Sequence, residues 1–126
     1  MTYLAVFEGK TGQVVVRDSL VQALRTDWPE AEVSVSSGDS PGREVRDVAW
    51  VYREAGSELE GRSHIDGTCL YIEGPLHLAV QFAVWYRRLV PQAEELIFCD
   101  DTYSFAVPVA VGTTPESVEA DVRATF

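Results

Sequence analysis

The sequence has few of the residues on which metal and redox sites depend. Its 126 residues include two cysteines, Cys69 and Cys99, and only two histidines. The cysteines show no CxxC spacing, and no histidine stands at a metal-binding spacing from them, so zinc binding and thioredoxin-like chemistry have no support. We therefore expect no metal ion, no cofactor, and two buried, reduced thiols in a cytosolic protein.

Basic residues are scarce relative to acidic ones. The chain has 10 lysine and arginine residues against 20 aspartate and glutamate residues, a formal net charge of -10 and a pI near 4.5. Such a surface repels nucleic-acid phosphates and anionic membranes, so we expect neither as a partner. It favours a basic protein or a cationic ligand. The alternative is that the charge only keeps the protein soluble and monomeric.

Long apolar runs are absent as well. No stretch approaches the roughly 18 apolar residues that can span a bilayer. Residues 1–10, MTYLAVFEGK, lack the basic start and the apolar length of a signal peptide. These absences predict a cytoplasmic protein with no membrane partner.

Catalytic and phosphate-binding motifs are also missing. The sequence contains no GxSxG, GxxxxGK[ST] or GxGxxG motif. His64 and Asp66 could orient an imidazole or supply two metal ligands, but a polar strand end before a turn accounts for them equally well. Arg87 and Arg88 could form an anion site, yet at the end of a helix they also suit its dipole. We expect no catalytic residue, no metal ligand and no enzyme activity.

Short alternating runs of apolar residues dominate what is present. Their period of two is typical of strands, and glycine-containing turns separate them. Strands are expected at residues 2–7, 32–36, 47–54, 57–65, 68–72, 96–99 and 105–111, with 13–17 as a further candidate. Together with three helices, they predict one α+β domain over residues 1–126. Its largely antiparallel sheet would have about six to seven strands, with the helices packed on it.

The segment 75–89 predicts a helix that forms the buried spine of the domain. Pro75 suits the first helical position, and apolar residues cover most of the helix circumference. His77, Gln81 and Arg88 mark its narrow solvent face.

The two other helices are predicted from their ends. Asp18 or Ser19 can cap the first helix, and Pro29 ends it. The last helix begins at one of the threonines at 113–114, and Glu116 stands three residues after the first of them, as in a capping box.

Two dipeptides predict hairpin turns in the middle of the chain. Ala55-Gly56 and Asp66-Gly67 each lie between alternating runs, and the second is of the kind that needs positive φ. The strand between these turns is polar apart from Leu59, so we expect it to be exposed on one face or to lie at an edge. A polar loop is expected at 36–44.

The most informative stretch of the chain is an acidic turn between two apolar strands. Asp100, Asp101 and Tyr103 occupy this turn, and Glu94 and Glu95 precede the first of the two strands. Tyrosine is enriched at interface hot spots. These five residues therefore predict a partner-binding surface rather than a reaction centre. The alternative is that Tyr103 packs in the core and that the acids are merely solvated.

Residues 82–118 read FAVWYRRLVPQAEELIFCDDTYSFAVPVAVGTTPESV. This run shows an apolar helix, RxxVP, a strand, an acidic DxxY turn, a second strand, and GTT before a helix. In this pattern it resembles the C-terminal part of small acidic immunity proteins of bacterial polymorphic toxin systems, such as those of contact-dependent inhibition and type VI secretion. The resemblance implies a cytoplasmic protein that binds a cognate toxin domain and blocks its active site or its access to substrate. Many such toxins are nucleases or nucleotide enzymes with basic clefts.

Under this hypothesis the acidic turn forms the toxin-binding site. Replacing Asp100 and Asp101 together by lysine is expected to weaken the complex and leave the fold intact. The competing hypothesis is a small enzyme or ligand-binding domain whose pocket lies between the sheet and the helix at 75–90, with His64, Asp66 or Asp100 as polar anchors. A homo-oligomeric structural protein is a third alternative.

Overall fold

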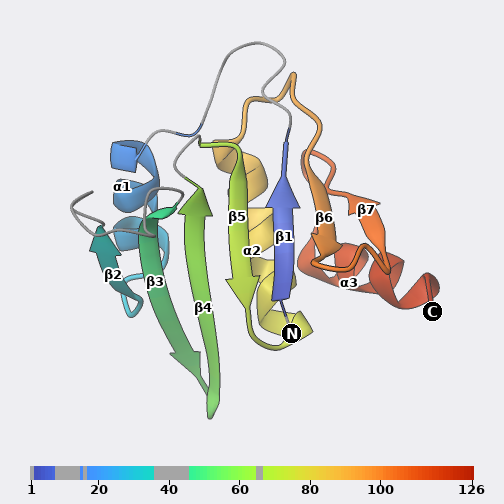
Figure 1. Ribbon diagram of the computed structural model, residues 1–126, viewed down its shortest axis with the longest axis horizontal. Helices are drawn as coiled ribbons and strands as arrows, with labels where there is room; N and C mark the ends of the chain where they lie inside the picture. Colours follow the sequence, from blue (N-terminus) through green and yellow to red (C-terminus); the bar gives the residue numbers. More distant parts are fainter. Residues whose placement is uncertain (1, 8–14, 16, 36–45, 65–66) are drawn as a thin grey trace.

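The computed structural model describes residues 2–7, 15, 17–35, 46–64 and 67–126. Within this part the chain forms seven strands in one antiparallel sheet, with three helices lying behind it in the view of Figure 1. The strands are β1 (Thr2–Val6), β2 (Glu32–Val35), β3 (Arg46–Glu54), β4 (Ser57–His64), β5 (Cys69–Glu73), β6 (Ile97–Asp100) and β7 (Ala106–Pro108). The helices are α1 (Arg17–Asp27), α2 (Leu76–Leu89) and α3 (Pro115–Ala124). The predicted α+β class is confirmed.

The first strand lies inside the sheet, whose order is β2-β3-β4-β5-β1-β6-β7. β1 pairs antiparallel with both β5 and β6. Its alternation turns Tyr3 and Ala5 into the core beneath the helices and leaves Leu4 and Val6 half-buried on the other face. We call this second face, turned away from the helices, the open face.

The hairpin β3–β4 closes through the expected two-residue turn. Ala55 has φ 50° and Gly56 has φ 83°, and Glu54 pairs with Ser57, as a type I′ turn requires. At the second predicted turn Gly67 has φ 76°, while Asp66 lies outside the described residues. β4 is an interior strand between β3 and β5, so of the two expectations for it, exposure on one face holds and the edge position does not.

α2 is the predicted spine of the domain. Nine of its residues are buried, whereas His77 and Arg88 are exposed and Gln81 is partly exposed. Aromatic rings join it to the rest of the core: Trp28 stacks on Phe82 at 4.1 Å between ring centroids. This helix buries a large apolar area, and the burial of apolar surface is the main favourable contribution to the free energy of folding.

Several local expectations differ from the structure or fall outside it. Asp18 and Ser19 lie inside the first turn of α1, so neither is its N-cap. The candidate strand 13–17 is wrong at its last residue, because Arg17 begins α1, and residues 13, 14 and 16 lie outside the described part, as does the expected loop at 36–44. α3 is capped by Thr114, whose hydroxyl accepts a hydrogen bond from the Ser117 backbone N–H at 3.2 Å. The helix therefore does not begin with the expected capping box, in which Thr113 would be the cap and Glu116 its partner, because the observed cap lies one residue after Thr113.

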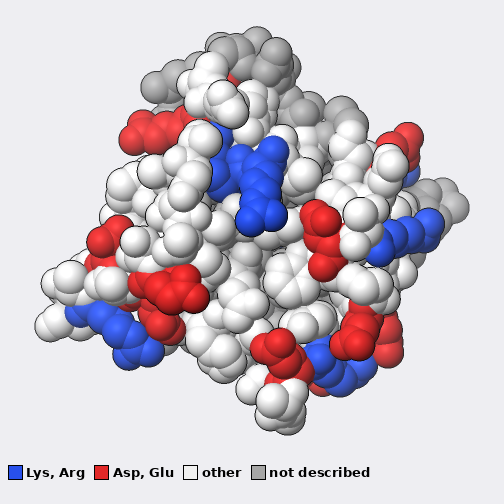
Figure 2. All heavy atoms as spheres, turned by 180° about the vertical axis from the view of Figure 1, so that it is seen from behind, with Lys and Arg blue, Asp and Glu red and all other residues white. Residues whose placement is uncertain are grey.

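Figure 2 shows the side of the molecule that carries the helices. Acidic and basic side chains alternate there around a largely uncharged centre, so the visible acidic groups do not form one continuous acidic surface.

None of the described helices is both long enough and apolar enough to cross a bilayer.

Candidate protein-binding surface

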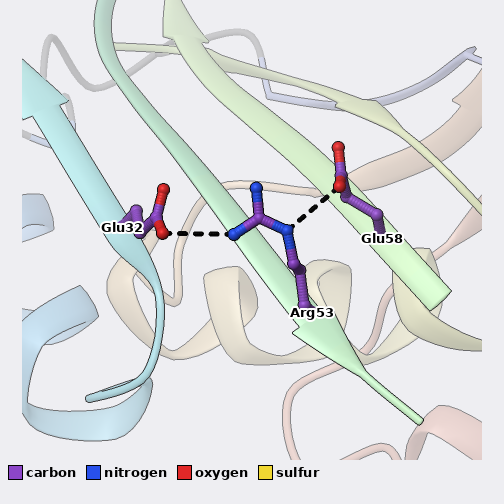
Figure 3. A network of polar contacts seen from close by, with 3 residues as sticks. All are labelled: Glu32, Arg53 and Glu58. Carbon is purple, nitrogen blue, oxygen red and sulfur yellow. Dashed lines mark hydrogen bonds and ion pairs between the residues drawn. The ribbon is translucent and has the colours of Figure 1, made fainter. Parts of the chain in front are cut away.

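The open face divides into a charged half and an apolar half. On the charged half, Arg53 of β3 lies between two carboxylates, donating to Glu32 of β2 at 3.1 Å and to Glu58 of β4 at 3.1 Å (Figure 3). Beside them Arg62 pairs with Glu60 at 3.2 Å. Because strand alternation puts these five side chains on one face, their charges largely cancel within the sheet.

Apart from Thr2 and Glu73, which are register partners, the side chains on the other half of the open face, over β5, β1, β6 and β7, are apolar. Cys69 and Cys99 are buried there, and the others are half-buried or exposed because strand alternation turns them away from the core. We define this apolar half by Leu4, Val6, Tyr71, Ile97, Ala106 and Pro108. A contiguous apolar area that no other element of the described chain covers is typical of a protein or ligand interaction site.

The five residues predicted to bind a partner flank this apolar half, but they are not equally accessible. Asp100 is only 4% exposed. Its carboxylate accepts the Ser104 backbone N–H at 2.7 Å and the hydroxyls of Ser104 and Thr102, and these hydrogen bonds, the Ser104 hydroxyl above all, hold its pKa below the usual value of an aspartate. Asp100 thus shapes the turn, and these hydrogen bonds give a reason to expect that its replacement by lysine lowers the stability of the fold. Asp101, beside it, is exposed.

Tyr103 is the most exposed aromatic ring of this region. Its side chain is 71% exposed, which excludes the alternative that it packs in the core. Its φ of 57° is left-handed, and its N–H donates to the Asp100 carbonyl at 3.2 Å. A left-handed residue after a tight turn is the usual place for glycine, and a tyrosine there carries strain. The turn therefore holds a large aromatic side chain out toward solvent.

Glu94 and Glu95 are positioned by a buried arginine at the end of α2. The Arg87 guanidinium donates to the carbonyls of Glu94 at 2.8 Å, Pro91 at 2.7 Å and Val90 at 3.3 Å, and burial lowers its pKa. Glu94 is buried and Glu95 is exposed. Arg87 thus serves the backbone of the loop before β6, which leaves the anion-site alternative without its main cation.

These acidic residues and Tyr103 meet at a cavity along β6 of about 350 Å³. The cavity is lined by Val6, Phe7, Ala93, Glu94, Glu95, Ile97, Cys99 and Tyr103. The sequence pattern did not indicate Val6, Ile97 and Cys99 as site residues because they read as core residues of apolar strands. One sequence feature could have indicated them: β1 and β6 are apolar on both faces, whereas a strand with one face turned to solvent needs apolar residues only on the face toward the core.

Cys99 lines the cavity, and the pKa of its thiol is raised. Burial raises the pKa of its thiol, and the nearby Asp100 carboxylate raises it further. A thiol must lose its proton to attack or to bind a metal. Both cysteines are buried and form no disulfide bond, as the sequence predicted, and Cys99 forms part of the apolar wall of the cavity.

Glu95 and Asp101, which lie on either side of β6, form no ion pair with a described lysine or arginine. The two residues lie six positions apart across a short strand, which places them about 20 Å apart if the chain is extended. A negative potential therefore remains available to a partner at both ends of the cavity strand.

The competing hypothesis placed a pocket between the sheet and the helix at 75–90. That interface is filled by aromatic packing, with Phe7 against Tyr86 at 6.3 Å and Trp50 against Phe82 at 6.0 Å between centroids. Of its polar anchors, His64 lies 6.2 Å from the ring of Tyr71 on the open face, and Asp66 is outside the described part. The described chain also brings together no group of three or more metal-binding side chains.

Comparisons with protein-family models, with curated proteins and with solved structures found no match.

Proposed function

We propose that this protein is an immunity protein that binds a cognate bacterial toxin domain in the cytoplasm and blocks its active site. One observation carries the proposal: the exposed Tyr103 and the unpaired carboxylates of Glu95 and Asp101 border the uncovered apolar half of the open face. An apolar centre with aromatic and charged groups around it is the usual composition of a protein interface.

The mechanism requires binding and no chemistry. Toxins that act on nucleic acids or nucleotides have basic clefts, and an acidic partner is steered toward such a cleft by long-range attraction. In the complex, the apolar half would bury its area, while Glu95 and Asp101 would meet basic groups at its margin. This arrangement explains why the charge is unpaired here and is cancelled by Arg53 and Arg62 on the other half of the sheet.

The test is a calorimetric titration of the purified protein with the toxin domain encoded beside it. Replacing Glu95 and Asp101 together by lysine should weaken binding at least about tenfold, most strongly at low salt. The matched control replaces Glu116 and Asp121 by lysine. These two residues are exposed on α3, so the control makes the same change in net charge on the opposite side of the sheet and should leave the affinity nearly unchanged.

Two results would contradict this account at different levels. If the wild-type protein neither binds the neighbouring toxin domain nor protects cells that express it, the proposed function is wrong. If the α3 variant loses affinity and the Glu95/Asp101 variant keeps it, the function stands and the interface lies on the helix side.

A further inference from the structure

The cavity along β6 lies within the proposed interface. Ala93 and the two glutamates precede β6, Tyr103 follows it, and Val6 comes from the neighbouring strand, so the cavity is lined from both ends and from one side. Its volume of about 350 Å³ is at the small end of the range for ligand pockets, about 300–1,000 Å³. It has room for one long side chain or one small molecule rather than a peptide segment.

The lining selects a cation with an aliphatic stem. Among the described residues, the charged ones that line the cavity are Glu94 and Glu95, and both are acidic. An anion would be repelled, and a neutral occupant would remove water from the carboxylates without replacing its hydrogen bonds. An ammonium or guanidinium group can pair with the exposed Glu95, while its stem packs on Val6 and Ile97.

Tyr103 adds a second feature that favours a cation. Tyr103 lines the cavity although it is 71% exposed, so it borders both the cavity and the solvent. The face of a tyrosine ring attracts ammonium and guanidinium groups.

We propose that this cavity is an anchor pocket for one long basic side chain, arginine or lysine, of the partner protein. The inference rests on the proposed function and names the chemistry by which the partner is held. A side chain of a protein is favoured over a free amine because the cavity is continuous with the apolar half: Val6 and Ile97 belong to both. A small amine would leave that apolar area exposed, whereas a protein that inserts one side chain would cover it.

The pocket can be tested first without the toxin. The ¹⁵N-labelled protein is titrated with n-butylguanidinium, and with n-pentanol as a neutral probe of similar length. We expect saturable amide shifts centred on Val6, Ile97 and Cys99, with a dissociation constant on the order of 1–10 mM, and pentanol binding at least about fivefold more weakly. Shifts spread over the whole surface, or equal binding of the two probes, would overturn the proposal.

Two variants then address the partner. Ala93→Trp places a large ring at the cavity and should weaken both butylguanidinium and toxin-domain binding at least about tenfold. Ala120→Trp, at an exposed position of α3, is the matched control and should leave both unchanged. Glu95→Gln keeps the shape of an exposed side chain, so it tests the charge even if Ala93→Trp perturbs the loop, and it should weaken both interactions severalfold.

A double-mutant cycle identifies the inserted side chain. Each arginine and lysine of the toxin domain is replaced by alanine in the wild-type and Glu95→Gln backgrounds. We expect a single toxin position at which the two losses are clearly less than additive. Its absence, in a complex that forms normally, would overturn the anchor.

The outcomes separate the two proposals. If the toxin complex forms and Ala93→Trp and Glu95→Gln bind as tightly as wild type, the anchor pocket is wrong and the proposed function stands. If butylguanidinium binds in the cavity but the toxin domain does not bind the protein at all, the proposed function and the anchor are both wrong, and the cavity is a site for a free organic cation.

Discussion

The indole of Trp50 lies directly over the backbone of Gly61 in the β3–β4 pair. The two residues are register partners, and a Cβ atom at position 61 would stand 2.2 Å from the Trp50 Cε2 and Cζ2 atoms. Trp50 is only 1% exposed, so its ring has no open space into which it could move. Glycine, the residue without a Cβ atom, is therefore required at position 61 of β4.

Gly61→Ala is therefore expected to destabilise the protein by roughly 1–3 kcal/mol, the usual cost of forcing extra atoms into a packed core. Urea unfolding measures the difference. Trp50→Phe, which shortens the ring, should restore part of the loss when it is combined with Gly61→Ala. If Gly61→Ala unfolds at the wild-type midpoint, the described Trp50 position is wrong.

Tyr103→Gly should separate stability from binding. Glycine adopts the left-handed conformation without strain, so the free energy of unfolding should rise by about 1 kcal/mol. Toxin-domain affinity should fall at least about tenfold, because the exposed ring is lost. Tyr103→Ala is the control: it loses the ring but keeps a Cβ atom in the strained conformation, so it should lose affinity without the gain in stability. Full affinity in both variants would remove Tyr103 from the interface.

Asp100→Asn should lower stability at neutral pH, and the deficit should shrink in acid. The folded pKa of Asp100 is held below its unfolded value, so the native state binds fewer protons than the unfolded state through this group. Its contribution is fully present above about pH 4, the unfolded value, and is lost as the pH falls through the lower, folded pKa.

The measurement is urea unfolding of wild type and Asp100→Asn from pH 7 down to pH 2.5. Ser104→Ala removes the hydroxyl donor but keeps the carboxylate, so it should show a smaller deficit with the same trend. A difference between wild type and Asp100→Asn that does not change with pH would contradict the hydrogen-bonded turn.

Arg87→Met should weaken toxin binding although residue 87 itself does not contact the partner. The guanidinium holds three carbonyls of the loop that carries Glu94 and Glu95, and methionine keeps the apolar stem but none of these hydrogen bonds. We expect a loss of roughly 2–3 kcal/mol in unfolding free energy, measured by urea unfolding. Butylguanidinium affinity should fall by about the same factor as toxin affinity, because one wall of the cavity is released. Unchanged binding of both would show that the loop keeps its position without Arg87.

The types of the secondary-structure elements can be predicted from local sequence patterns alone. Alternation in β1 and the nearly complete apolar circumference of α2 follow from local periodicity, and the positive φ of Gly56 follows from the need for a two-residue turn. The exposure of Tyr103 could not be predicted in this way, because an aromatic residue in a turn between two apolar strands fits the core and the surface equally well.

The way in which these elements combine into a surface depends on the tertiary structure and cannot be predicted from local patterns. Pairing β1 between β5 and β6 brought Val6, from the start of the chain, beside Ile97, a juxtaposition that no local pattern encodes. The same packing divided the acidic residues by role: the hydrogen bonds from Ser104 turned Asp100 inward, while Asp101 stayed outside. Periodicity records which side chains share a face, but which strands adjoin, and which faces the helices leave uncovered, depends on contacts between distant parts of the chain.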